Sequence, residues 1–243
     1  GVGERRLPRP KRSSWGIVLK LCLAQTVVQY FFFYIGVSNA PGVKGSIINA
    51  ANTFFSVLVA CLVFRQERLT HRKVLGCLVG FAGVVLVNLT GEGLGGGMTL
   101  TGEGFILIST VSYAVSSALI HEYSQHDDPV TLSGYQFVLG GIILTAVGLL
   151  GGGRLPQVTP AGIGMLLYLA LVSGVAYSVW SVLLKHNPTS KVVIFGFMNP
   201  VFGVIISSVL LHEANVLPWQ QCAVALLLIT AGIYAVNRPS RRT

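Results

Sequence analysis

The stretch Lys191-Val-Val-Ile-Phe-Gly-Phe-Met-Asn-Pro-Val-Phe-Gly-Val-Ile-Ile-Ser-Ser-Val-Leu-Leu-His212-Glu213 is apolar over about the length that a helix needs to cross a bilayer. Asn199 and Pro200 lie near its middle. Proline removes a backbone donor and frees a carbonyl one turn earlier, so in hydrocarbon the helix kinks and needs polar neighbours. The stretch therefore predicts a transmembrane helix that is bent beside an amide, an arrangement from which membrane proteins build binding sites.

The composition of the whole chain indicates an all-α membrane protein. Its 243 residues are 52% hydrophobic and only 10% charged, whereas a soluble chain carries about 25% charged residues. The net charge of +9 comes from short basic segments between apolar runs, and no nucleic-acid-binding module is present, so the expected partner is a lipid bilayer. The four cysteines lie inside apolar runs without paired or metal-ligand spacing, and the histidines lie near run boundaries, so we expect no disulfide, metal or cofactor.

Eight membrane spans are predicted from the apolar runs. Short segments rich in glycine, proline and asparagine connect them, which places consecutive helices antiparallel and leaves no room for a second domain. The predicted spans are Trp15–Val37, Lys44–Phe64, Lys73–Leu89, Leu100–His121, Leu132–Leu150, Ala161–Leu184, Val192–Leu211 and Leu217–Val236.

The distribution of lysine and arginine predicts the orientation of the spans. Of the 17 basic residues, all except Lys20, Lys44 and Arg154 fall in the N-terminal segment 1–14, in the connections that would share its side of the membrane, or in the tail 238–243. Because cytoplasmic segments are enriched in basic residues, both termini are predicted to be cytoplasmic.

The sequence contains a weak internal repeat. Glu67 ends the second predicted span and Glu213 ends the seventh, and setting these two residues level places Thr53-Phe54 opposite Asn199-Pro200. The helix after each glutamate carries a similar tail, Ala82-Gly-Val-Val-Leu-Val-Asn88 in one and Ala231-Gly-Ile-Tyr-Ala-Val-Asn237 in the other. An odd number of spans separates the copies, so the second is inverted in the membrane, as in many secondary transporters.

With these features the chain resembles the EamA type of the drug/metabolite transporter superfamily. The resemblance implies two inverted repeats of five helices each, and this chain matches helices 3–10 of that ten-helix fold. Residues 15–90 correspond to the last three helices of the first repeat and residues 100–237 to all five of the second, so the first two helices of the family are absent. The matching residues are Glu67, Glu213, Leu75-Gly76, Ala82-Gly83, Gly102-Glu103, Ser112-Tyr113-Ala114 and Asn199-Pro200.

The candidate substrate-binding residues are polar or aromatic side chains at mid-membrane depth. Polar groups at this depth are costly to keep, although helix packing and interhelical hydrogen bonds are alternative roles for each of them. Aromatic rings with polar tips stack on organic solutes, but they also pack at interfaces. The candidates are Gln25, Gln29, Tyr30, Asn49, Asn52, Thr53, Tyr113, Tyr177, Trp180, Asn199 and Pro200.

The charged residues are expected to have structural roles. Glu67 and Glu213 are predicted to form interfacial ion pairs, and Glu103 is predicted to cap the helix that begins after Thr101. No carboxylate is placed near mid-membrane, where a proton-driven pump usually keeps one. This favours a facilitator or exchanger, or coupling through a group near the membrane edge or on the missing helices.

The resemblance implies a secondary transporter rather than an enzyme. We expect it to export an amino acid or a related small metabolite across the bacterial inner membrane by alternating access, and a homodimer is left open. A truncated, non-transporting product and an integral membrane enzyme are the alternatives, the enzyme being disfavoured because no catalytic constellation is present.

Overall fold

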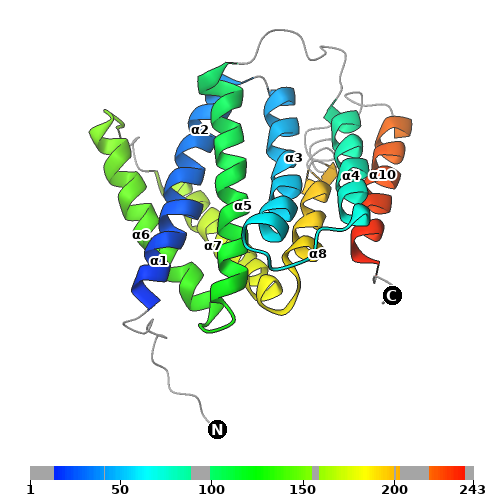
Figure 1. The fold of residues 1–243 in the computed structure, drawn as a ribbon. Helices are drawn as coiled ribbons and strands as arrows, with labels where there is room; N and C mark the ends of the chain where they lie inside the picture. Colours follow the sequence, from blue (N-terminus) through cyan, green and yellow to red (C-terminus); the bar gives the residue numbers. More distant parts are fainter. Residues whose placement is uncertain are drawn as a thin grey trace. The chain divides into compact units, whose positions relative to one another are not determined.

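The computed structural model describes residues 14–40, 42–88, 99–154, 159–199, 201–202 and 219–238, and every regular element in these ranges is helical (Figure 1). The described residues form two compact units. The first contains those up to Val28 and those from Leu119 to His186, and the second contains Gln29 to Ala118 and those from Asn187 onward.

The helices follow the apolar runs of the sequence. Short π-helical or 3₁₀ segments (η) interrupt or extend several of them. In chain order the elements are α1 (Trp15–Leu21), η2 (Cys22–Val28), α2 (Gln29–Asn39), α3 (Gly42–Leu58), η3 (Val59–Val63), α4 (His71–Asn88), η4 (Leu100–Gly104), α5 (Phe105–Tyr123), α6 (Pro129–Leu150), α7 (Pro160–His186), α8 (Thr189–Val193), η5 (Ile194–Phe197) and α10 (Trp219–Asn237).

Five of the eight predicted spans are confirmed, within the described residues, as helices long and apolar enough to cross a membrane. The third corresponds to α4, whose first turn is charged, and the eighth to α10, which is apolar over Ala223–Asn237. The seventh is described over residues 192–199 and 201–202, and Pro200 and the following Glu213 lie outside the described residues. The five confirmed helices are Trp15–Asn39, Gly45–Val63, Leu100–Tyr123, Pro129–Leu150 and Pro160–His186.

In the first unit, α6 packs along α1 and η2 and also contacts α7. The sequence sets the start of α6, because Pro129 occupies its first turn and the Asp128 carboxylate accepts a hydrogen bond from Thr131 N at 2.7 Å. Further along, a Cβ on Gly140 would lie 2.3 Å from Thr26 Cγ2, so only glycine permits this contact with η2. α6 is thereby held against the π-helical part of the first span.

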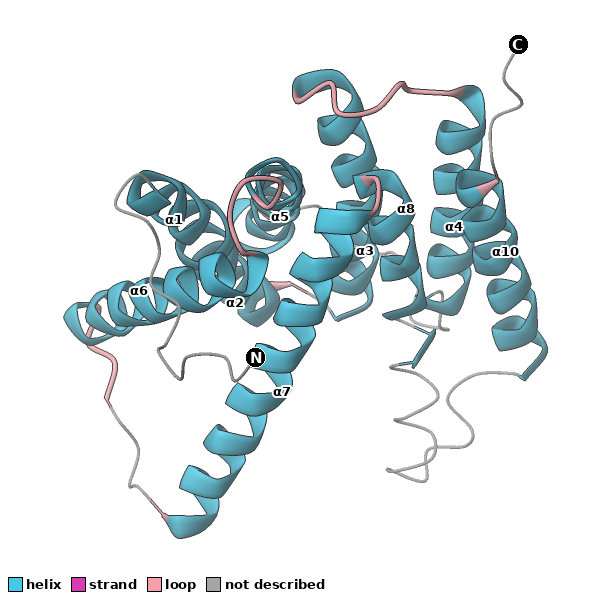
Figure 2. Ribbon diagram, turned by 90° about the horizontal axis from the view of Figure 1, so that it is seen from below, coloured by secondary structure: helices cyan, strands magenta, loops and turns pink. Residues whose placement is uncertain are grey.

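In the second unit, α4 and α10 lie side by side in both views (Figures 1 and 2). A Cβ on Gly232 of α10 would lie 2.5 Å from the carbonyl oxygen of Gly76 in α4, so the two backbones are in direct contact. Small residues allow such close approach between membrane helices. α3 packs against α4, α8 and η5, and Phe197 of η5 is fully buried.

The first part of α7 is exposed along its whole length. Residues 160–176 are exposed on every side, and Leu166 and Leu171 are 69% and 68% exposed. In Figure 2 this part of α7 extends away from α6 of the same unit. A helix that is apolar all round belongs in lipid or against another apolar helix rather than in water.

Candidate functional site

The first unit contains a buried pair of amides. Gln25 lies in η2 and Gln136 in α6, both side chains are fully buried, and Gln136 Nε2 donates to Gln25 Oε1 at 2.5 Å. A π-helical turn inside a longer helix often marks a functional site, since it widens the helix and changes which side chains face inward. The two amides are therefore brought together by the irregular part of the first span.

One donor and one acceptor of this pair form no hydrogen bond with the residues that the structure describes. Gln25 Nε2 and Gln136 Oε1 are buried and have no hydrogen-bond partner among the described residues, and the same holds for Thr26 Oγ1. A buried polar group without a partner costs about 1–3 kcal/mol. An arrangement that keeps several such groups together is suited to a ligand or water that supplies the missing partners.

Further polar and aromatic contacts join α6 to α7 beside the amide pair. Ser133, three residues before Gln136, has its hydroxyl 2.6 Å from that of Ser181, and both serines are buried. The rings of Phe137 and Tyr177 lie 4.6 Å apart between centroids. We call Gln25, Thr26, Ser133, Gln136 and Ser181 the amide cluster.

The second unit contains a smaller polar group between α3 and η5. Thr53 is fully buried, and its hydroxyl lies 3.2 Å from the carbonyl oxygen of Val193 and 3.1 Å from Asn52 Oδ1. A Cβ on Gly196 would lie 2.9 Å from Thr53 Oγ1, so the glycine keeps this approach open. The structure thus places Thr53 against the 3₁₀ turn that precedes Asn199, whose own side chain is exposed.

The remaining candidates are distributed over both units. Trp180, with Gln25 and Tyr177, belongs to the first unit, where it is half-buried in α7. In the second unit Tyr30 stacks on Tyr34 at 5.9 Å, and Pro200 lies outside the described residues. The candidates that are half-buried in the second unit are Gln29, Tyr30, Asn49, Asn52 and Tyr113.

Gln136 was missed by the sequence analysis. It is an amide near the start of the apolar run Leu132–Leu150, and no other glutamine or asparagine stands in that run. A lone amide in a membrane helix is a sufficient reason to place it on an inward face, so the signal was present. Its partner Gln25 was identified by the same argument.

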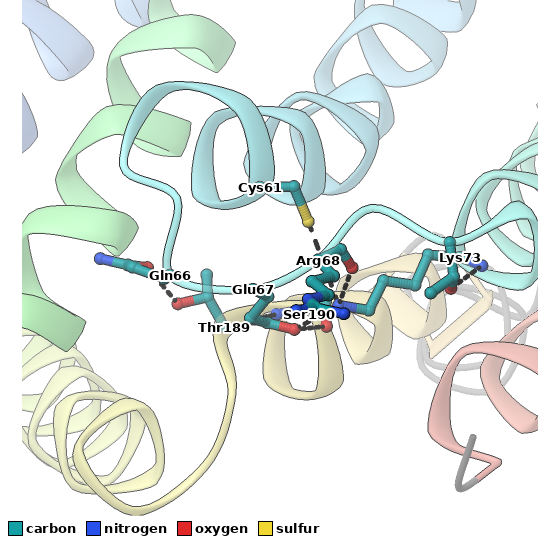
Figure 3. Close-up of polar contacts among 8 residues, drawn as sticks. Cys61, Gln66, Glu67, Arg68, Lys73, Thr189 and Ser190 are labelled. Carbon is teal, nitrogen blue, oxygen red and sulfur yellow. Dashed lines mark hydrogen bonds and ion pairs between the residues drawn. The ribbon is translucent and has the colours of Figure 1, made fainter. Parts of the chain in front are cut away.

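Glu67 organises the connection between η3 and α4 (Figure 3). Its carboxylate accepts hydrogen bonds from Lys73 Nζ at 2.6 Å, from Ser190 N at 2.8 Å and from Ser190 Oγ. Next to it Gln66 Nε2 donates to the Ala118 carbonyl at 2.8 Å, and Thr189 Oγ1 donates to Gln66 Oε1 at 3.1 Å. These bonds fasten the η3–α4 loop to the start of α8, and they confirm the predicted local ion pairing of Glu67.

The protonation of Glu67 follows from these contacts. Burial raises the pKa of the carboxyl, but the hydrogen bonds from Lys73 and Ser190 outweigh burial and hold the pKa below the usual value of a glutamate. Glu67 is therefore an ionised structural anchor.

Glu103 has the capping role that was predicted for it. Its carboxylate accepts hydrogen bonds from Thr99 N at 2.9 Å and from Thr99 Oγ1 at 2.8 Å, at the start of the helix formed by η4 and α5. A carboxylate that reaches back to the residue before the helix satisfies a donor that the helix itself leaves free.

Comparison with known proteins gives a consistent result. The model of the EamA-like transporter family matches residues 2–89 and 100–238. An uncharacterised transporter of Archaeoglobus fulgidus is 28% identical over 234 residues, which are 95% of this chain and 79% of the relative. The uncharacterised transporter YvbV of Bacillus subtilis is 26% identical over 95% of this chain and 74% of its own length.

Two further matches are a plant protein and a solved structure. A WAT1-related chloroplastic protein of Arabidopsis thaliana is 25% identical over 97% of this chain and 57% of its own length. A crystal structure superimposes with a TM-score of 0.77 at 20% identity, over 93% of this chain and 77% of the other, which shows a shared fold.

Proposed function

Because this chain belongs to the EamA-like transporter family, we propose that it is a secondary carrier that moves a small organic metabolite across a membrane by alternating access. Its curated relatives are named transporters and not enzymes. The proposed solute class is an amino acid or a related compound, and the proposed direction is export across the bacterial inner membrane.

The amide cluster is the observation that supports this solute class. An amino acid carries an ammonium group, which only donates hydrogen bonds, and a carboxylate, which only accepts them. Gln136 Oε1 is the free acceptor and Gln25 Nε2 is the free donor. Both atoms are buried inside the first unit. Neutral amides satisfy a zwitterion without leaving an unpaired charge in the membrane when the site is empty.

The polar group around Thr53 fits the same proposal. Thr53 lies in the segment that the internal repeat sets level with Asn199-Pro200, and its hydroxyl donates to the carbonyl of Val193, the residue directly before η5. Interrupted helices near the midplane of inverted repeats form the binding sites of many secondary transporters. On this basis we propose eight spans, arranged as a partial and a complete repeat with both termini cytoplasmic.

The proposed transport is not driven by a mid-membrane carboxylate. Among the described residues the acidic side chains stand at helix ends or in connections, namely Glu67, Glu103, Glu122, Asp127 and Asp128. Proton-coupled carriers usually keep an ionisable group within the membrane. We therefore propose facilitated diffusion or exchange.

A transport assay with variants in η2 and α6 tests the proposal. The double variant Gln25→Leu/Gln136→Leu removes both amides, so no half-satisfied partner remains and folding is expected to change little. In proteoliposomes tested with an amino-acid and drug panel, with and without a pH gradient, we expect transport to fall at least about tenfold, the loss of one good hydrogen bond to a charged group.

The control for that assay is Thr145→Val, which removes an exposed polar group from the same helix. It should transport like the unaltered chain. Unchanged transport by the double variant, at equal folded yield, would remove the amide cluster from the substrate site.

A second candidate function is that of an incomplete carrier, which inserts but does not transport by itself. The exposure of residues 160–176 on every side favours it, since the first unit by itself leaves this surface of α7 uncovered. Gel-filtration mass, together with transport by a version that carries two further helices before Trp15, distinguishes the two candidates.

A further inference from the structure

A basic pocket lies in the second unit. Its volume is about 520 Å³, and the loop around Glu67, the first turn of α4, the start of α8 and the end of α10 line it. The cationic residues in its wall are Arg68, Arg72, Lys73, Lys191 and Arg238.

The charge of this pocket is not balanced by the protein. Glu67 is the acidic residue in its wall, and that carboxylate is already bound by Lys73 and Ser190. The other four cationic side chains are exposed and form no ion pair with any described residue; they are Arg68, Arg72, Lys191 and Arg238. Four like charges around one hollow attract an anion.

The donors in the pocket suit a phosphate. Guanidinium groups bind phosphate oxygens through two parallel N–H donors, and the pocket contains three arginines. The Thr70 hydroxyl and the Lys191 ammonium, also in the wall, supply further donors.

The surroundings of the pocket favour a lipid over a free phosphate. Val63, which ends the membrane-spanning helix Gly45–Val63, is 68% exposed, and the basic loop follows directly, so the pocket stands at the level of lipid headgroups. On α4, Leu75 and Leu78 are 60% and 50% exposed; Leu75 follows Arg72 by three residues and Leu78 follows Leu75 by three, so each neighbours the one before it on the helix surface. A phosphate held by Arg72 would have its acyl chains along this apolar strip.

We propose that the pocket binds the phosphate headgroup of an anionic phospholipid, whose acyl chains lie along Leu75 and Leu78. Basic pockets at the cytoplasmic ends of membrane helices are suited to such headgroups. The lipid would connect the η3–α4 loop to the ends of α8 and α10, all within one unit. The proposal is independent of the transported solute.

The test uses the full chain, purified in detergent and freed of lipid. Bound lipid is counted by native mass spectrometry, and thermal unfolding is followed with phosphatidylglycerol, phosphatidylcholine or glycerol phosphate added. We expect phosphatidylglycerol to bind and to raise the unfolding temperature. We expect phosphatidylcholine and glycerol phosphate to do neither at the same concentration.

Charge-matched variants locate the site. Arg72→Gln/Arg238→Gln removes two pocket cations, and Arg154→Gln/Lys185→Gln removes two cations outside the pocket. The first pair should weaken phosphatidylglycerol binding about thirtyfold, at roughly 1 kcal/mol for each basic residue near an anionic lipid. The second pair should leave it within about twofold, the range of a surface substitution. Arg68→Gln/Lys191→Gln repeats the test on two other pocket residues if the first pair folds poorly.

Three outcomes would overturn the proposal. Equal retention of phosphatidylglycerol and phosphatidylcholine would show that charge does not select the lipid. Unchanged phosphatidylglycerol binding by both pocket variants would place the lipid elsewhere. Glycerol phosphate that binds as tightly as the lipid would make the ligand a soluble phosphate.

Discussion

Glu67 is the residue on which the η3–α4 connection depends. Three hydrogen bonds from Lys73 and Ser190 converge on its carboxylate, and its side chain is only 10% exposed. Hydrogen bonds to a charged group are stronger than those between neutral groups, and loss of one partner leaves the other groups unsatisfied. The start of α8 is therefore hydrogen-bonded to the η3–α4 connection through this side chain and its neighbour Gln66.

The depressed pKa of Glu67 predicts an acid-sensitive connection. A carboxyl whose pKa is lower in the folded than in the unfolded chain stabilises the fold above the ordinary glutamate pKa of about 4.3. That stabilisation is lost as the pH falls through the folded-state pKa. Thermal unfolding in detergent between pH 7 and pH 3 should show this loss.

Glu67→Gln tests that effect, because it removes the charge and keeps the shape of the side chain. At pH 7 it should destabilise the protein by about 1–3 kcal/mol, and its stability should fall less steeply on acidification. Parallel pH profiles of the variant and the unaltered chain would mean that another group titrates.

Asn199 supports a second prediction at this scale. It follows the 3₁₀ turn η5 and its side chain is exposed, so it forms little of the packed core. Asn199→Ala should therefore lower transport more than it lowers the yield of folded protein, as measured by uptake per mole of purified chain. Equal losses of transport and yield would assign Asn199 a structural role.

Single residues could be predicted from the sequence where their chemistry conflicts with a membrane environment. Gln25 was identified in this way, and Gln136 was within reach of the same argument. The contact between them was not predictable, because it depends on the π-helical turn of η2, whose residues Cys22–Val28 have the composition of an ordinary span. Lys73 and Ser190 were also not predicted as the partners of Glu67. Ser190 is distant from Glu67 in the sequence, so the pattern gives no sign of this contact.

At the scale of elements, close contact through small residues holds α4 against α10. The Gly232 backbone lies against the Gly76 carbonyl, and a Cβ on Gly83 would lie 2.9 Å from the carbonyl oxygen of Ala225. In lipid there is no hydrophobic force between helices, so such van der Waals contact carries much of the association. The pair α4–α10 is therefore sensitive to added volume.

Gly232→Ala tests this sensitivity with the smallest available change. The new methyl group must move the Gly76 carbonyl and the backbone of Gly80, so we expect a loss of about 1–3 kcal/mol in the free energy of unfolding. Gly141→Ala is the control, since nothing lies within 4 Å of its Cβ and alanine has the higher helix propensity. If both variants have the same free energy of unfolding in a titration with denaturing detergent, α4 and α10 are not closely packed at Gly232.

The long helices were predictable because run length and composition decide whether a helix spans a membrane. The runs from Trp15, Leu100 and Leu132 became helices with ends within a few residues of the prediction. The exposure of α7 was not predictable, because the apolar composition of Pro160–His186 is the same whether a helix or lipid covers it. Hydropathy alone does not say what packs against a span.

At the scale of the whole molecule, basic residues are distributed unevenly among the connections between helices. The η3–α4 loop and the start of α8 carry several of them, whereas the connection after α6 has Arg154. Anionic headgroups and the insertion machinery favour basic residues on the cytoplasmic side. The same asymmetry underlies the predicted orientation and the basic pocket that we propose as a lipid site.

Cysteine labelling at the two ends of α6 tests this orientation. His126 lies in the turn before α6 and Arg154 follows it, and both are exposed. α6 has the length and hydropathy of a membrane span, so its ends should face opposite compartments. In intact cells a membrane-impermeant maleimide should label an Arg154→Cys variant at once and label His126→Cys only after permeabilisation.

The unaltered chain is the control for that labelling, because its described cysteines Cys22, Cys61 and Cys77 are buried. The reverse pattern would invert the orientation and place the basic pocket on the outer face, where anionic phospholipids are scarcer. Immediate labelling of both variants would mean that α6 does not cross the membrane. With α6 removed from the membrane, the amide cluster would lose Gln136 as an intramembrane group, and the proposed carrier mechanism would fail with it.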